Sequence, residues 1–189
     1  AELRATCDIP LGNEIVSYGV SPVMGRDESE WSYEATFDGG VRAVNGRPVA
    51  GAGVVIWGAA QSDGTRPVLG RCRISIPRVA SVLYAEAVGC GEALRWLAAH
   101  DVTVRLARVC GENLAVLRFC AHEGRLRDPV VHDVLDRALN AVYARGWRIE
   151  WTAIRRRFNV AADRLATEGI MHAVSLAESG RHDVVMNWY

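Results

Sequence analysis

The chain has 189 residues, half of them hydrophobic, which is enough for one domain with extensions and a sizeable core. Its 22 basic residues balance its 22 acidic ones, so overall charge does not indicate a nucleic-acid-binding protein. Every basic residue is Arg, and the absence of Lys excludes enzymes that depend on a Walker, Schiff-base or kinase Lys.

The cysteines and the apolar segments bear on location. There are five cysteines, an odd number with no CxxC pair, which favours reduced, mostly buried thiols over a disulfide framework or a zinc site. No apolar run reaches the length of about 18 residues that a membrane span needs, and the first residues lack a signal peptide's apolar centre. We therefore expect an intracellular protein, cytoplasmic or nuclear, with no membrane partner. The missing initiator Met indicates an excised fragment or a processed product.

The first part of the chain divides into an arm and a meander. Residues 1–32 have no clean hydrophobic period, so we interpret them as an N-terminal arm or linker with a short strand near 15–18. From Tyr33 the pattern sharpens, and short turns such as Asn45-Gly46 separate alternating runs. This predicts three antiparallel strands, at 33–42, 49–57 and 68–76.

Helical and strand patterns alternate after residue 80. Ser81 is a candidate N-cap for the first long helix, in which Glu92 has the pattern of a solvated residue. Gly169 is expected to end the last helix. Helices are predicted at 81–99, 112–120, 129–145 and 159–169, and strands at 102–109 and 147–154. The element order predicts an α/β fold, a mixed sheet with helices on both faces.

The strand at 33–42 carries the residue around which the site is predicted. Asp38 lies within it and is followed at once by Gly39 and Gly40. Glycines at this point let another backbone, or a phosphate, come close. The simpler interpretation is a hairpin turn, since Asp-Gly between apolar runs is a strong turn signal.

Three further acidic residues stand where they could converge with Asp38. They are Glu86 in the first long helix, Glu112 just after the fourth strand and Asp163 near the start of the last helix. An unpaired carboxylate is costly to bury, so such positions indicate partners or metal ions. Mg²⁺ or Mn²⁺ would suit a carboxylate cluster, and two such ions can activate a water in phosphodiester hydrolysis.

Each of these acids also has a simpler explanation when it is considered alone. Glu86 would usually be a solvated helix residue, and Glu112 could be a first-turn acid favoured by the helix dipole. Asp163 could pair with Arg156 or Arg164. The functional interpretation therefore depends on the joint pattern of element order and acids.

That joint pattern resembles the ribonuclease H family. The matching segments are Phe37–Gly40, Ala85–Ala87 with Ala93–Leu94, Gly111–Asn113 and Asn159–Ala166. The last of these resembles the family's N-x-x-A-D-x-L-A signature and is the most specific. The resemblance extends from about Tyr33 to Gly169, so we expect a ribonuclease H-like domain at 33–170 and a C-terminal tail at 171–189.

The resemblance implies a ribonuclease H-like fold with a five-stranded mixed sheet. It also implies a two-metal site (two Mg²⁺, with Mn²⁺ as a possible substitute) and cleavage of the RNA strand of an RNA–DNA hybrid. Asp38, Glu86 and Asp163 match the family's metal-binding acids, whereas Glu112 stands where Asp is usual. Many members carry a His before the last helix. This chain has Arg there, and Arg156 resembles the Arg of some plant and retroelement relatives.

The resemblance and the residue chemistry together define the expected site. Asp38, Glu86, Glu112 and Asp163 would be catalytic and would hold the metal. Substrate contacts are expected from Gly39, Gly40, Asn113, Arg155, Arg156, Arg157 and Asn159, with the three Arg on phosphates. A reverse-transcriptase domain of a retroelement polyprotein would precede the chain.

Two alternatives stay open. One is a weakly active or inactive ribonuclease-H-fold module that binds nucleic acid or protein. The other is a different nuclease of the same broad fold, such as a junction resolvase or transposase, against which the segment 159–166 argues.

Overall fold

The structure is a computed structural model that describes residues 16–18, 31–63, 65–78 and 80–189. The strands are β1 (Val16–Tyr18), β2 (Tyr33–Val44), β3 (Arg47–Gly58), β4 (Val68–Ile76), β5 (Leu106–Gly111), β6 (Arg148–Ala153) and β7 (Val185–Trp188). The helices are α1 (Val82–Ala99), α2 (Leu114–Cys120), α3 (Pro129–Ala144) and α4 (Val160–Glu178), with a short 3-10 helix η2 (Arg156–Phe158) before α4.

All these strands form one mixed sheet in the order β1-β6-β5-β2-β3-β4-β7. β2, β3 and β4 make the expected antiparallel meander, and β2–β5 and β5–β6 pair in parallel. The hairpin between β2 and β3 closes at Asn45 and Gly46, whose φ angles of 50° and 74° fit a two-residue turn. The sheet has seven strands instead of the expected five because β1 and β7 extend its two edges.

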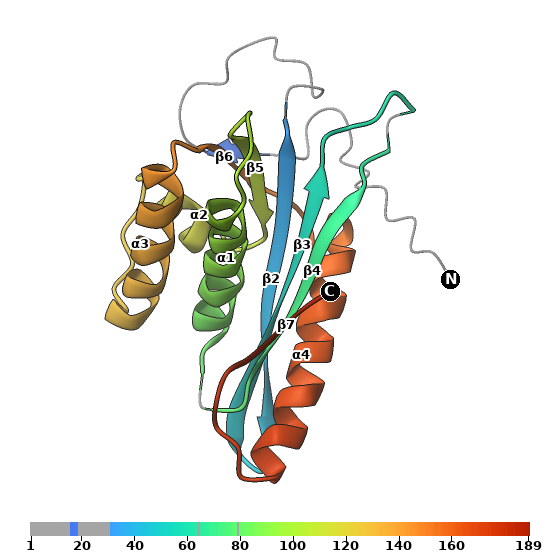
Figure 1. Ribbon diagram of the computed structural model, residues 1–189. Coiled ribbons are helices and arrows are strands. Elements are labelled where there is room, and N and C mark those ends of the chain that lie inside the picture. The colour runs from blue at the N-terminus through green and yellow to red at the C-terminus, as the bar shows by residue number, and fades with distance from the viewer. Residues whose placement is uncertain (1–15, 19–30, 64, 79) are drawn as a thin grey trace.

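The helices cover both faces of the sheet, as expected. α1, α2 and α3 lie on one face, and α4 runs along the other (Figure 1). Ser81 caps α1 by accepting a hydrogen bond from the backbone of Tyr84 over 3.0 Å. None of the described helices is long and apolar enough to cross a membrane.

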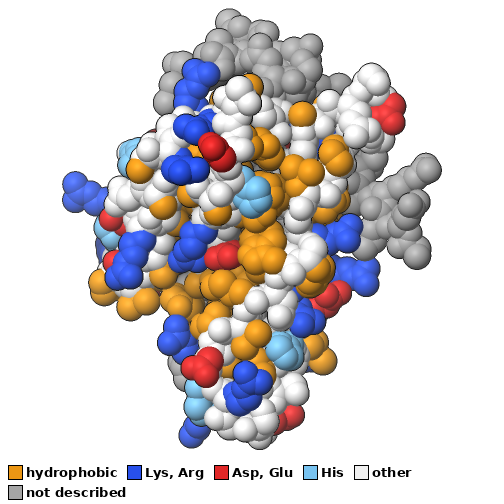
Figure 2. Space-filling model, in the orientation of Figure 1, with side chains coloured by type: hydrophobic (Ala, Val, Ile, Leu, Met, Phe, Trp, Pro, Cys, Tyr) orange, Lys and Arg blue, Asp and Glu red, His pale blue; other side chains and the backbone are white. Residues whose placement is uncertain are grey.

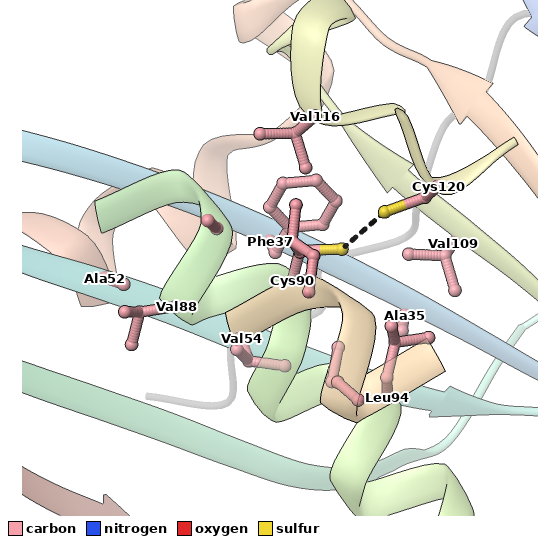
Figure 3. Packing of buried hydrophobic residues seen from close by; sticks show 14 of the residues in the cluster. Ala35, Phe37, Ala52, Val54, Val88, Cys90, Leu94, Val109, Val116 and Cys120 are labelled. Atoms are coloured by element: carbon pink, nitrogen blue, oxygen red, sulfur yellow. Dashed lines mark hydrogen bonds between the residues drawn. The ribbon is translucent and has the colours of Figure 1, made fainter. Parts of the chain in front are cut away.

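The main core lies between the sheet and α1, α2 and α3. Phe37 of β2 is fully buried there, next to Cys90 of α1 and Cys120 of α2 (Figure 3). The two sulfur atoms are 3.9 Å apart and are thiols. All four described cysteines are buried and free, which confirms that part of the prediction, whereas Cys7 lies outside the described residues.

Glycines allow α4 to lie directly on the sheet. A Cβ at Gly51 or Gly53 of β3 would collide with the backbone of α4, and one at Gly169 would collide with the carbonyl of Ile74 on β4. The expectation that Gly169 ends the last helix is therefore wrong, because this glycine serves close packing in mid-helix. The helix ends near Gly180, which has a φ of 74°.

The segment expected to be a tail is part of the same folded unit. The boundary at residue 170 falls inside α4, and β7 pairs with β4. Trp188 of β7 donates a hydrogen bond to Glu92 over 2.9 Å and packs near Trp96 of α1, where hydrophobic side chains gather between α1 and β7 (Figure 2). Glu92 is thus not a solvated residue: it is 8% exposed and pairs with Arg95.

Candidate active site

Asp38 lies in the middle of β2, opposite Gly53 of β3. Directly paired residues point to the same face, and α4 covers Gly53, so Asp38 faces the start of α4. Its side chain is buried. Burial raises the pKa of Asp38 to about 7, with further contributions from the negative charges of Glu112 and Asp163. A hydrogen bond from the backbone of Gly39 partly opposes this shift.

Glu86 approaches Asp38 from α1. Gly39 has no side chain, and a Cβ there would collide with the backbone of Ala85 and Glu86, so α1 lies directly against β2 at this point. The expectation that glycine admits another backbone here is confirmed. Glu86 is buried, and its Oε2 atom has no hydrogen-bond partner among the described residues. Burial, followed by the charges of Asp38 and Glu112, raises the pKa of Glu86 to about 9.

Glu112 comes directly after β5. The parallel pairing of β5 with β2 brings this end of the strand beside the middle of β2, and the ring of Phe37 fills the space that a side chain at Gly111 would occupy. Burial raises the pKa of Glu112, while a hydrogen bond from Asn159 opposes the shift. Its Oε1 atom is buried without a partner in the described part of the chain.

Asp163 lies in the first turn of α4 and completes the set. Two nitrogens of Arg156, Nε at 3.1 Å and Nη2 at 2.7 Å, donate to its Oδ1 atom. The pairing with Arg156 that the sequence allowed is therefore present. Because the charge of Asp163 also acts on Asp38 and Glu112, the ion pair belongs to the acidic cluster.

Asn159 lies between the strand and the helix that carry two of the acids. It is 1% exposed, and its Nδ2 atom donates to the carbonyl of Phe37 over 2.8 Å. The backbone carbonyl of Asn159 accepts a hydrogen bond from the backbone N–H of Asp163 over 3.0 Å. The Asn159 side chain also forms a hydrogen bond with Glu112. These contacts hold Asn159 inside the protein, and its expected contact to sugar or phosphate stays a prediction. Its position one helical turn before Asp163 is the sequence signal for the backbone contact between them.

Two other expected substrate contacts are also engaged within the protein. The open side of Gly40 faces the side chain of Ile170, which a Cβ would meet at 3.0 Å. The Oδ1 atom of Asn113 caps α2 by accepting from the backbones of Ala115 and Val116 at 3.0 and 3.3 Å. Gly40 is thus explained by packing against α4, and Asn113 by its role as the N-cap of α2.

The expected arginine cluster is exposed at the edge of the site. Arg155 precedes η2, and Arg156 and Arg157 form its first two residues. The guanidinium of Arg157 lies 4.8 Å from the centre of the Phe158 ring. The phosphate contacts of these arginines stay predictions.

The four acids fit divalent cations by their chemistry. They come from four separate segments, and mutual repulsion contributes to the raised pKa values of Asp38, Glu86 and Glu112. Unpartnered buried carboxylate oxygens are hard ligands of the kind that Mg²⁺ takes. Among the described residues, no group of three or more His, Cys, Asp or Glu side chains has an arrangement that could hold a metal ion.

The comparisons with known proteins agree with this architecture. No protein-family model matches the sequence, and no curated protein matches it. Among solved structures, the chain is similar to the N-terminal RNase H domain of a Mycobacterium tuberculosis protein, with 22% identity, a TM-score of 0.59, and coverage of 77% of this chain and 99% of that one.

Two further structures are similar. LC11-RNase H1 in complex with an RNA/DNA hybrid shows 22% identity and a TM-score of 0.62, covering 75% of this chain and 99% of that one. The foamy viral protease-reverse transcriptase shows 17% identity and a TM-score of 0.55, covering 77% and 97%. At this level of identity the likeness establishes the fold: the chain has the ribonuclease H fold, as the sequence predicted.

Proposed function

We propose that this protein is a divalent-metal-dependent endoribonuclease that hydrolyses the RNA strand of RNA–DNA hybrids. The observation that carries the proposal is that Asp38 lies near enough to Glu86, Glu112 and Asp163 for their charges to interact. The shared fold supports it, since one solved protein of this fold is in complex with an RNA/DNA hybrid.

The four acids would hold two Mg²⁺ ions, with Mn²⁺ as a substitute. Bound ions of this kind supply an activated water and stabilise charge at a scissile phosphate. With a pKa of about 7, Asp38 is partly protonated at neutral pH, and Glu86, with a pKa of about 9, is mostly protonated, so both side chains would give up protons on becoming ligands. Asn159 holds β2 and the start of α4 together, which fixes Asp38 relative to Asp163.

Substrate binding would use the exposed arginines beside the acids. Arg155 and Arg157 contact phosphates, which are natural partners for a guanidinium. Selection of a hybrid over duplex DNA would come from 2′-hydroxyls and the shape of the helix.

We further propose that the chain acts beside a reverse-transcriptase domain of a retroelement, in an intracellular compartment. Support for the first part is the shared fold with a viral protease-reverse transcriptase. Support for the second is the set of buried free thiols at Cys72, Cys90, Cys110 and Cys120, which suits a reducing compartment.

A second candidate is a weakly active or inactive module that binds nucleic acid or protein. Two observations favour it. Glu112 has a longer side chain than the Asp that is usual at this position, and Arg156 forms an ion pair with the carboxylate of Asp163.

A cleavage assay separates these functions. The protein is incubated with a labelled RNA–DNA hybrid, duplex RNA, duplex DNA and single strands, each with Mg²⁺ or Mn²⁺. We expect cleavage of the RNA strand of the hybrid alone. Asp38→Asn removes a charged ligand with little change of shape, so it should abolish cleavage and keep hybrid binding. Equal cleavage of duplex DNA, or wild-type turnover by Asp38→Asn, would exclude the proposed function, and binding without cleavage would favour the module.

A further inference from the structure

The guanidinium of Arg156 faces the acidic cluster. The charge of Arg156 lowers the pKa values of Asp38, Glu86 and Glu112. Hydrogen bonding to Asp163, followed by the charges of Asp163, Glu112 and Asp38, raises the pKa of Arg156 in return. The guanidinium therefore compensates the negative charge of the cluster.

The contact between Arg156 and Asp163 engages a carboxylate oxygen that could otherwise bind a metal ion. Nε and Nη2 of Arg156 both donate to the same oxygen, Oδ1, at 3.1 and 2.7 Å. A divalent cation on that oxygen would stand within a few ångströms of the guanidinium, and the two positive charges would repel each other. Arg156 and a metal ion thus compete for Asp163.

The geometry also lets the Arg156 side chain leave. The side chain is 77% exposed, whereas that of Asp163 is 32% exposed. Ion pairs in contact with solvent are weak, so a divalent ion can displace this one. The backbone of Arg156 is held independently, because its carbonyl accepts from the backbone of Asn159 over 2.9 Å. Release is therefore a side-chain movement that leaves η2 in place.

We propose that Arg156 is an internal counter-cation, which occupies Asp163 in the metal-free protein and is released when a divalent ion binds. This inference rests on the proposed metal-dependent function. In the metal-free protein the guanidinium of Arg156 would pair with Asp163, and metal binding would make it available for the expected contact with a substrate phosphate. Metal binding and substrate binding would then reinforce each other.

The first test measures metal affinity without any substrate. Mn²⁺ binding is followed by calorimetry for the wild type, Arg156→Gln, and the matched control Arg164→Gln. Arg164 is adjacent to Asp163 in sequence and exposed, but it pairs with Glu168 at 3.1 Å. We expect Arg156→Gln to bind Mn²⁺ at least about threefold more tightly, the factor that a partly exposed ion pair can supply, and Arg164→Gln to match the wild type. Equal or weaker binding by Arg156→Gln overturns the inference.

The second test observes the guanidinium directly. In an NMR titration with Mg²⁺, the Nε–Hε signal of Arg156 should move from a bonded to a solvent-exposed position as the site fills. In Asp163→Asn the signal should change little on adding Mg²⁺. A wild-type signal that stays unchanged at saturating Mg²⁺ contradicts the inference.

The results distinguish a failure of the counter-cation role from a failure of the proposed metal-dependent function. If the wild type binds Mn²⁺ and cleaves hybrids but Arg156→Gln binds no more tightly, only the counter-cation role fails. If the wild type binds no divalent ion at all, the metal-dependent function fails and the counter-cation role fails with it.

Discussion

The side-chain amide of Asn159 donates a hydrogen bond to the carbonyl oxygen of Phe37 over 2.8 Å, although 122 positions separate them in the chain. Phe37 directly precedes Asp38, and Asn159 precedes Asp163 by one helical turn. The bond therefore connects the strand that carries one acid to the helix that carries another. Catalytic groups need placement within fractions of an ångström, which gives this contact functional weight.

Asn159→Ala should lower kcat at least about tenfold because it loosens the placement of the acids. KM for the hybrid should change little, since Asn159 is buried. The free energy of unfolding should fall by about 1–3 kcal/mol, because the Phe37 carbonyl loses its buried partner. Steady-state kinetics and denaturant unfolding measure these quantities. Asn140→Ala, on the exposed side of α3, is the control. A raised KM with unchanged kcat would instead indicate a substrate contact.

The stability of the metal-free protein should fall as the pH rises from 5 to 9. Folding raises the pKa of Asp38 to about 7 and that of Glu86 to about 9, so the folded state binds more protons than the unfolded chain in this range. The stabilising contribution is complete below the unfolded pKa values, near pH 4, and is lost as the pH passes through 7 and then 9. Thermal unfolding in a chelator measures this slope, and Mg²⁺ should reduce it.

Asp38→Asn should flatten the first part of that slope, between pH 5 and 8. Without metal at pH 8 it should melt at least about 2 °C above the wild type, equivalent to about 1 kcal/mol for a chain of this size. Asp136→Asn, an exposed change on α3, is the control and should keep the wild-type slope. An unchanged slope in Asp38→Asn would mean that Asp38 does not carry a raised pKa.

Glu112→Asp should raise Mg²⁺-supported cleavage by much more than it raises the Mn²⁺ rate. Mg²⁺ demands near-ideal octahedral geometry, and Mn²⁺ binds such ligands more tightly and tolerates an imperfect one better. Parallel rate measurements with each ion on both proteins test this. Lower activity with both ions would show instead that the backbone at Gly111 has adapted to the longer side chain.

Glu34 and Arg108 form a buried ion pair between β2 and β5. Arg108 Nε lies 2.9 Å from Glu34 Oε2, and the side chains are 7% and 0% exposed for Arg and Glu respectively. Glu34→Gln should therefore cost about 3–5 kcal/mol in denaturant unfolding, because a neutral amide replaces the buried carboxylate that pairs with Arg108. The double change Glu34→Leu with Arg108→Met should recover most of this loss. A single variant as stable as the wild type would show that water reaches the pair.

Arg155→Gln and Arg157→Gln should each weaken hybrid binding and reduce the slope of log affinity against log salt concentration by about 1. The physical reason is the loss of one phosphate contact per variant. Titrations at several salt concentrations measure the slope, with Arg137→Gln on α3 as the control. A slope equal to that of the wild type would show that the arginines face away from the substrate.

Periodicity and turn chemistry in the sequence determined most of the fold. The alternation from Tyr33 onwards, the Asn45-Gly46 turn and the Ser81 cap are local signals, and local backbone preferences decide the elements that they mark. The sequence also indicated the four acids, because unpaired carboxylates are costly to bury.

Tertiary packing decided what local signals could not. Gly169 is compatible with a helix end or with a close crossing, and only the carbonyl of Ile74 lying against it selects the crossing. Glu92 is a typical surface residue by sequence, and it is buried because β7 returns to bring Trp188 against it. Contacts of this kind join residues about a hundred positions apart, so no window of sequence contains both partners.

Contacts between distant parts of the chain also decide which partners the site residues have. The sequence determined that Asn159 and Arg156 lie near the acids. The structure decided that Asn159 bonds the Phe37 carbonyl inside the protein, and that Arg156 pairs with Asp163. A side chain's role follows from its burial and its partner, and both are set only when β2 and α4 come together.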